Sequence, residues 1–361
     1  MKKYLTFLRS LLKDRPYVKF VYMTGILPIA KYSSGSELNM FAEYTMAGEE
    51  RFSEYFGFTE QEVDELYERY QKRNKNALKV SREGLKLWYD GYNTQSGEKL
   101  YNPRSVVIAL SNNNLGNYWT SSGPYDEIYY YISNNVADVR DDLALMIAGE
   151  SVPVRIYEYA ATSQNLKTKE EIFSAMVVYG FLKYEKGRVS VPNRELMEKF
   201  SDMLRKEPSL GYVYRLANIS SKMLQATLAG DTDTMSEIIT YAHNTEVPIL
   251  SYNNETELSA VINLIYLAAR DEYRVEREDK AGRGFVDFIF YPIRYDQDCI
   301  ILELKVDHTP EDAIRQICEK EYALRFRGKT AEQIRYTGRI LAVGISYNKE
   351  TKEHKCKVEV L

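Results

Sequence analysis

The chain has 361 residues, of which 44% are hydrophobic and 28% are charged, and its formal net charge is −4. This composition is ordinary for a globular protein of two or three domains, and the weak acidity argues against a histone-like binder with a basic surface. The 3 cysteines form no CxxC pair and the 3 histidines are scattered, so we expect neither a disulfide framework nor a zinc site. No signal peptide or membrane-spanning run is recognised, which predicts a cytoplasmic protein without membrane contact.

The first third of the chain is predicted to contain helices and one short strand. Met1–Leu12 has the apolar spacing of an amphipathic helix, and Val18–Met23 is predicted to form a short buried strand. A second helix is predicted over Thr59–Lys75, because Thr59 begins a capping-box pattern. Asn102-Pro103 has the residue types with which helices begin.

The middle of the chain is predicted to combine helices with one hairpin. A polar stretch precedes a Tyr-rich helix over Tyr125–Val136, and another helix begins at Thr168 and ends before Gly180. Phe181–Val191 then has a tight turn at Glu185-Lys186-Gly187, which is typical of a β-hairpin. Further amphipathic helices are predicted over Arg194–Arg205, Tyr212–Ala229 and Met235–His243.

A helix followed by such a hairpin resembles a winged helix. The cations of the hairpin, Lys183, Lys186 and Arg188, are placed to contact DNA, or the element serves as a lid or supports the fold. Because no recognition helix rich in Arg and Lys is present, we favour structural support. Pro248 is predicted to mark the hinge to the last part of the chain.

Two charged strands dominate the last third of the sequence. Gly284–Phe290 and Ile300–Val306 are short apolar runs that predict buried strands, yet they carry Asp287, Glu303 and Lys305. Side chains alternate along a strand, so Glu303 and Lys305 lie on the same face. A buried unpaired charge is costly, so either a bound metal or a mutual ion pair is the expected compensation. The ion pair alone, in a structural role, is the alternative to a metal site.

Helices and strands are predicted on both sides of this pair. A helix is predicted over Leu258–Arg270, with Glu255 near its start, where the helix dipole favours a carboxylate. Thr309 is predicted to cap a later helix, on which Gln316 faces the same region. The remaining predicted strands are Tyr273–Glu278, the core strand Arg339–Tyr347 and an edge strand over Cys356–Leu361.

The order of these pieces resembles a known family. Asp287 and, sixteen positions later, Glu303-Leu304-Lys305 resemble the PD-(D/E)xK nuclease motif. The resemblance includes Asn254–Ser259 upstream and Ala313–Ala323 downstream. It is closest to the PD-(D/E)xK domain fused behind AAA-ATPase-like domains in prokaryotic proteins. It implies a mixed α/β (α+β) fold with an αβββαβ restriction-endonuclease-like core.

The first part of the chain is similar to the latter part of that AAA-ATPase-like domain. The similarity rests on the strand at Val18–Met23, on Trp88–Tyr92 (WYDGY) and on Tyr101–Ser105 (YNPRS). No G-x-x-x-x-G-K-[ST] phosphate loop occurs in the sequence, so we do not expect the chain to hydrolyse ATP by itself. The resemblance predicts three parts: an incomplete ATPase-like segment (1–115), a helical, winged-helix-like region (116–246) and a nuclease-like domain (247–361).

The resemblance also implies a site and an activity. Asp287, Glu303 and the backbone carbonyl of Leu304 are expected to bind Mg²⁺, with Mn²⁺ as a substitute, and Lys305 is expected to orient the attacking water. Glu255 and Gln316 are secondary site residues, with Glu257 competing for the role of Glu255. The expected substrate is nucleic acid, with DNA favoured over RNA. The expected partners also include another protein or the missing ATPase part.

A non-catalytic module is the alternative from another functional class. In that case the incomplete ATPase-like segment and the nuclease fold would bind nucleic acid or a protein partner. The intact Asp287, Glu303 and Lys305 set favours the enzyme, and the missing phosphate loop favours the module.

Overall fold

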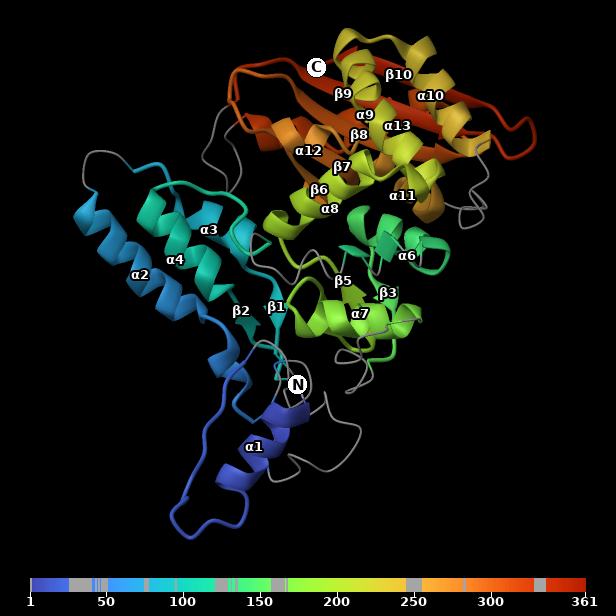
Figure 1. Cartoon of the computed structure of the whole chain (residues 1–361). Coiled ribbons are helices and arrows are strands. Elements are labelled where there is room, and N and C mark those ends of the chain that lie inside the picture. Colours follow the sequence, from blue (N-terminus) through green and yellow to red (C-terminus); the bar gives the residue numbers. More distant parts are fainter. Residues whose placement is uncertain are drawn as a thin grey trace. The chain divides into compact units, whose positions relative to one another are not determined.

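The structure is a computed structural model of the chain, shown in Figure 1. It describes residues 2–25, 41–42, 44, 46, 51–74, 78–94, 96–120, 129–130, 132–133, 136–156, 166, 168–244, 255–281, 284–327 and 336–361. The chain divides into two compact units, residues 1–199 and 200–361, each with its own core. The finer division at residues 115 and 246 stays a prediction. Among the described residues, no helix has the length and apolarity needed to cross a membrane.

The first unit is mostly helical. Its helices include α1 (Lys2–Leu12), α2 (Glu60–Arg73), α3 (Arg82–Tyr89), α4 (Pro103–Asn112), α6 (Val136–Ile147) and α7 (Lys169–Val178). A 3-10 helix, η2 (Ser53–Phe56), and a small hairpin of β1 (Tyr92–Asn93) and β2 (Lys99–Leu100) complete its first half. The predicted helix starts are confirmed, because Thr59 and Thr168 each form a capping box and the side chain of Asn102 accepts from the amide of Ser105.

The predicted strand Val18–Met23 is wrong. These residues have no regular secondary structure, and Phe20 and Tyr22 are 84% and 80% exposed. A strand needs a neighbouring strand to satisfy its backbone, and no described segment pairs with this one. The predicted Tyr-rich helix over Tyr125–Val136 and the hinge at Pro248 lie largely or wholly outside the described residues.

The predicted hairpin is confirmed and has a third strand. β4 (Lys183–Glu185) and β5 (Arg188–Ser190) are antiparallel, and β3 (Val152–Pro153) pairs with the other edge of β5. Lys186 and Gly187 have φ angles of 47° and 81°, as the tight turn requires. The sequence did not predict β3, because a strand of two residues leaves no alternating pattern to detect.

A five-stranded mixed sheet forms the centre of the second unit. Its strands are β6 (Tyr273–Ala281), β7 (Gly284–Pro292), β8 (Cys299–Val306), β9 (Ile340–Tyr347) and β10 (His354–Val360), in the spatial order β10-β9-β8-β7-β6. All neighbours are antiparallel except β8 and β9, which are parallel and joined through α13 (Pro310–Glu319). The predicted αβββαβ core and the edge position of β10 are thus confirmed.

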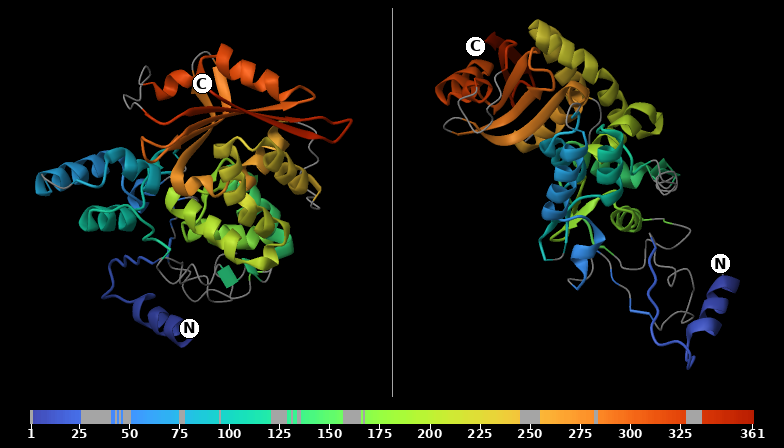
Figure 2. Two further views of the ribbon diagram at one scale, coloured as in Figure 1. Left: turned by 90° about the horizontal axis from the view of Figure 1, so that it is seen from above. Right: turned by 90° about the vertical axis from the view of Figure 1, so that its left-hand side faces the viewer.

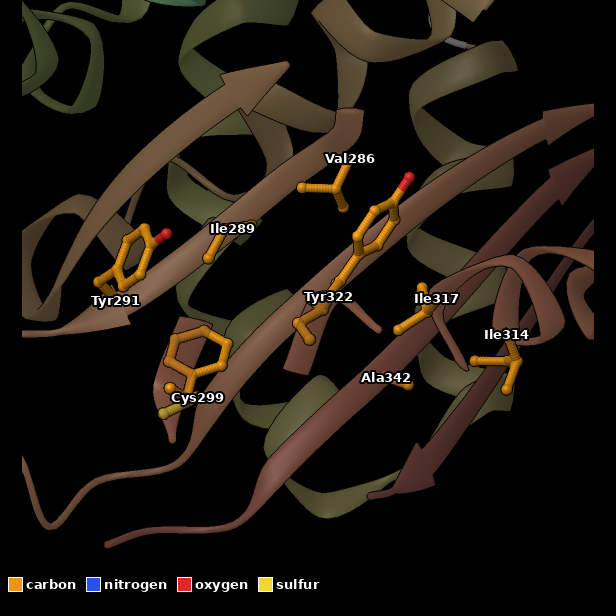
Figure 3. Close-up of a cluster of buried hydrophobic side chains, with 10 residues drawn as sticks. Val286, Ile289, Tyr291, Cys299, Ile314, Ile317, Tyr322 and Ala342 are labelled. Atoms are coloured by element: carbon orange, nitrogen blue, oxygen red, sulfur yellow. The ribbon is translucent and has the colours of Figure 1, made fainter. Parts of the chain in front are cut away.

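Helices cover both faces of this sheet (Figure 2). α13 packs on β8 and β9, and a hydrophobic cluster fills the space beneath it and η5 (Tyr322–Phe326), as Figure 3 shows. The other face carries α10 (Thr232–Asn244) against β10 and α11 (Glu255–Ile265) against β8. The remaining elements of this unit are α9 (Tyr212–Ala229), α12 (Ala269–Glu272) and η4 (Pro208–Leu210), while α8 (Arg194–Lys206) contains the unit boundary.

The single helix predicted over Leu258–Arg270 is wrong, because α11 and α12 are separated by a turn. The backbone N–H of Ala268 donates to the hydroxyl of Ser220 on α9 instead of continuing the helical ladder. An external acceptor at this point ends the helix, and a periodic sequence pattern does not reveal it.

Two histidines meet at the end of the sheet where β9 joins β10. His354 lies directly opposite Tyr347 on the neighbouring strand, with ring centroids 4.8 Å apart, and the ring of His243 from α10 lies 5.1 Å from each. Burial, together with the smaller effect of the neighbouring His243, lowers the pKa of His354 to about 4. Burial also lowers the pKa of His243, with nearby Lys352 acting in the same direction.

This cluster predicts acid sensitivity. In the unfolded chain His354 titrates near its ordinary pKa of 6.5, so below that pH the unfolded state takes up the proton first. The contribution of neutral His354 is complete above pH 6.5 and is lost as the pH falls towards 4, by up to about 3 kcal/mol. Urea unfolding from pH 8 to 4 should therefore show a flatter profile for His354→Phe than for the wild type. The exposed His308→Gln variant should keep the wild-type profile.

Candidate functional site

The register of β7 and β8 brings Asp287 and Glu303 together. The ladder between the two strands ends with the pair Phe288 and Leu302, and Asp287 and Glu303 are the next residues of β7 and β8. Side chains alternate along a strand, so Asp287 and Glu303 both lie on the face opposite to that of Phe288 and Leu302. The two predicted carboxylates therefore share one place on one face of the sheet.

Backbone hydrogen bonds hold each carboxylate against the other strand. The N–H of Leu304 donates to Oδ2 of Asp287 at 2.7 Å, and the N–H of Asp287 lies 3.4 Å from Oε2 of Glu303. The main chain of Leu304, whose carbonyl was the third predicted ligand, thus lies beside the Asp287 carboxylate. Neither carboxylate can move far without breaking a contact to the neighbouring strand.

Two further predicted residues converge on one oxygen of Glu303. Nζ of Lys305 lies 3.1 Å from Oε1 of Glu303, and the side-chain amide of Gln316 donates to the same oxygen. The side chains of Glu303 and Lys305 are only 4% and 17% exposed. The ion pair weighed as an alternative is therefore present, and it is formed by Glu303 and Lys305.

Gln316 lies on α13. The helix begins with a capping box between Thr309 and Asp312, and its buried face packs on β8 and β9. After the helix, Glu321 adopts a φ of 58° and the chain turns, so that Tyr322 lies back under the helix.

Tyr322 lies beside the candidate site, and the sequence predicted no role for it there. Its phenol is 1% exposed and hydrogen-bonds with Gln316. Burial raises the pKa of Tyr322, and the hydrogen bond to Gln316 acts in the opposite direction. In sequence it is indistinguishable from the core aromatics around it.

The acidic residue expected from the first helix is not settled. α11 begins at Glu255, three residues before the predicted start at Leu258, and the side chains of Glu255 and Glu257 lie outside what the structure describes. The choice between them stays open.

Residues 254–355 match the family model described as the PD-(D/E)XK nuclease superfamily. This part of the chain is a PD-(D/E)XK nuclease superfamily domain. It contains Asp287, Glu303, Lys305 and Gln316 together with Tyr322. No curated protein and no solved structure matches the chain. The match does not reach residues 1–253, so their resemblance to an AAA-ATPase-like domain stays a prediction.

The nuclease-superfamily domain keeps two like charges in a poorly hydrated place. Burial and, to a smaller extent, the charge of Asp287 raise the pKa of Glu303 to about 7, against the opposing effect of Lys305. At neutral pH the carboxylate is therefore only partly ionised, although it lies between an ammonium group and another carboxylate. A bound divalent cation would relieve this repulsion.

The donor set fits a hard cation. In the described part of the chain no group of three or more His, Cys, Asp or Glu side chains gathers as a metal site. Among the described groups, the candidate protein ligands are the oxygens of Asp287 and Glu303 and the Leu304 carbonyl. Mg²⁺ commonly binds through one or two carboxylates and keeps several waters, so it suits this small set of oxygen donors.

We expect the titration of Glu303 to respond in opposite directions to its two charged neighbours. Asp287→Asn removes a like charge and should lower the pKa of Glu303, whereas Lys305→Met removes the opposing cation and should raise it. Carbon-13 NMR of the labelled glutamate carboxyls in EDTA measures both shifts. Equal pKa values in the three proteins would contradict the described geometry.

The same raised pKa has a consequence for stability. Because the folded-state pKa of about 7 exceeds the ordinary 4.5, the contribution of protonated Glu303 is complete below pH 4.5 and is lost as the pH rises through 7. Asp287→Asn should reduce this loss in metal-free urea titrations.

Proposed function

We propose that the chain hydrolyses phosphodiester bonds of nucleic acid, with Mg²⁺ as cofactor and DNA as the preferred substrate. The observation that carries the proposal is the buried pair of Asp287 and Glu303, with Lys305 on the same face, inside a domain of the PD-(D/E)XK nuclease superfamily. A structural ion pair needs one carboxylate, and here a second carboxylate raises the electrostatic cost. A cation bound between the two carboxylates would offset that electrostatic cost.

The side chains have distinct parts in the proposed reaction. Asp287, Glu303 and the Leu304 carbonyl would hold the ion, which when bound would lower the pKa of a water and offset charge on the attacked phosphate. Lys305 would orient the attacking water and stabilise the negative charge that develops on the phosphate. Gln316 fixes one oxygen of Glu303, so that the other oxygen faces Asp287.

Several finer proposals rest on the sequence alone. Residues 1–115 are proposed to be AAA-ATPase-like and unable to hydrolyse ATP by themselves, and the protein is proposed to be cytoplasmic with a protein partner. The hairpin Phe181–Val191 is proposed to be part of a winged helix. Its cations already have neighbours in the fold, since Lys183 lies 3.9 Å from Glu185 and Arg188 donates to Ser151. These contacts support a structural part for the hairpin.

The activity is tested by cleavage of plasmid DNA, DNA oligonucleotides and RNA in Mg²⁺, Mn²⁺ or EDTA. We expect cleavage that EDTA abolishes, and a rate lower by about 10²–10³ for Lys305→Ala, as for the loss of other preorganised electrostatic groups. Lys355→Ala is the matched control, because Lys355 is exposed on the edge strand β10. Equal rates for the wild type and Lys305→Ala would mean that the cleavage arises elsewhere or from a contaminant.

Thermal melts separate the metal site from a purely structural ion pair. A cation that binds only the folded state should raise the melting temperature of the wild type in millimolar Mn²⁺. Asp287→Asn should be at least as stable as the wild type in EDTA, because it removes repulsion and its amide oxygen can still accept from Leu304. It should lose most of the Mn²⁺-induced increase, whereas Asp296→Asn, in an exposed loop, should keep it.

The opposite result favours the non-catalytic module. A wild type that is insensitive to Mn²⁺, with Asp287→Asn destabilised equally in both buffers, would leave Asp287 with a structural role only.

A further inference from the structure

Gly344 lies beside Glu303, where the backbone of α13 approaches β9 closely. The two residues are paired in the parallel ladder of β8 and β9, so a side chain at position 344 would point to the same face as Glu303. That face is the one covered by α13. A Cβ atom at Gly344 would lie 2.3 Å from the backbone oxygen of Pro310 and 3.1 Å from Cβ of Ala313.

No side chain fits in this space. The nearest atom is backbone, so it cannot turn away as the end of a flexible side chain can. Even the methyl group of alanine requires the helix to move by roughly 1 Å to restore an ordinary contact distance. The backbone of Gly344 is not in the left-handed region, so close approach, and not backbone conformation, explains the need for glycine.

Gln316 depends on this close approach. It follows Ala313 by three residues, so the two side chains are neighbours on the helix surface and move together. Its amide bridges Glu303 on the strand and Tyr322 after the helix. Glu303 is itself tied to Asp287 and Lys305, so it is not free to follow a displaced helix.

We propose that Gly344 is a positioning residue, which sets the depth of α13 so that Gln316 holds Glu303 in the geometry that binds a divalent cation. The cation-binding part of this proposal rests on the proposed function, whereas the effect on Gln316 does not. Groups that orient a metal ligand typically change metal affinity about 10- to 100-fold when they are lost.

Gly338 offers a matched control in the same unit. A Cβ atom there would lie 2.0 Å from the backbone oxygen of Gln297, so Gly338→Ala introduces a comparable clash. It precedes β9, six residues before Gly344, which corresponds to roughly 20 Å of extended chain. We therefore expect Gly338→Ala to lower the free energy of unfolding without changing the position of Gln316.

The first experiment needs no metal. The side-chain amide signals of Gln316 are recorded by proton–nitrogen NMR for the wild type, Gly344→Ala and Gly338→Ala in EDTA. We expect these signals to shift towards solvent-exposed values in Gly344→Ala alone. Unchanged signals in Gly344→Ala would overturn the proposal whatever the enzyme does.

The second experiment measures Mn²⁺ affinity by calorimetry. We expect Gly344→Ala to bind Mn²⁺ about 10-fold more weakly than the wild type, and Gly338→Ala to bind it as the wild type does. Gln316→Ala and the double variant Gly344→Ala/Gln316→Ala should have equal affinities, because Gly344 acts through Gln316. Fully additive losses would overturn the proposal and leave the proposed function intact.

Two further outcomes distinguish a failure of the proposed function from a failure of the positioning role. A wild type that binds no Mn²⁺ contradicts the proposed function and the cation-binding part of this proposal, while the NMR test of Gln316 still decides the positioning part. If Gly344→Ala does not fold, Ala313→Val pushes the helix away from the other side of the same contact. Its Gln316 signals and Mn²⁺ affinity should then change as stated for Gly344→Ala, and wild-type values would overturn the proposal.

Discussion

The pairing of β7 with β8 is the constraint on which the site depends. Both faces of β8 are buried, so a slip of one residue would turn Glu303 away from the face covered by α13 and towards the apolar face that α11 covers. The observed register leaves Asp287 and Glu303 side by side, just beyond the pair Phe288 and Leu302. The hydrophobic core therefore keeps the two carboxylates close together in spite of their repulsion.

The rest of the site offsets this repulsion from three directions. Lys305 contributes a positive charge from the same strand, the amide of Leu304 contributes a donor from the backbone, and Gln316 contributes a donor from the helix above. These three groups belong to β8 and α13, which are held in place by the packing of the domain. The balance of charges around Glu303 therefore depends on the packing of the whole domain. The small residues Ala342 and Gly344 on β9 allow the helix to lie near enough to take part.

The sequence predicted the parts that depend on local pattern. Apolar runs bounded by turns predicted β7, β8 and β9. The alternation of side chains along a strand predicted that Glu303 and Lys305 lie on the same face of the sheet. The capping residue Thr309 predicted the start of the helix that carries Gln316. What it missed depends on neighbours distant in sequence. Val18–Met23 is apolar enough for a strand but pairs with no described segment, and Tyr322 belongs to the site only because Glu321 turns the chain back.

The distances in sequence between paired strands bear on the order of folding. β7 and β8 are joined by residues 293–298, whereas β9 reaches β8 only after residues 307–339. Closing the shorter connection costs less chain entropy, so the hairpin that joins Asp287 to Glu303 forms more readily than the parallel pair. At that stage water still surrounds both carboxylates. Their repulsion becomes costly only when α13 packs over them and excludes that water, so it opposes the packing of α13 and not the formation of the hairpin.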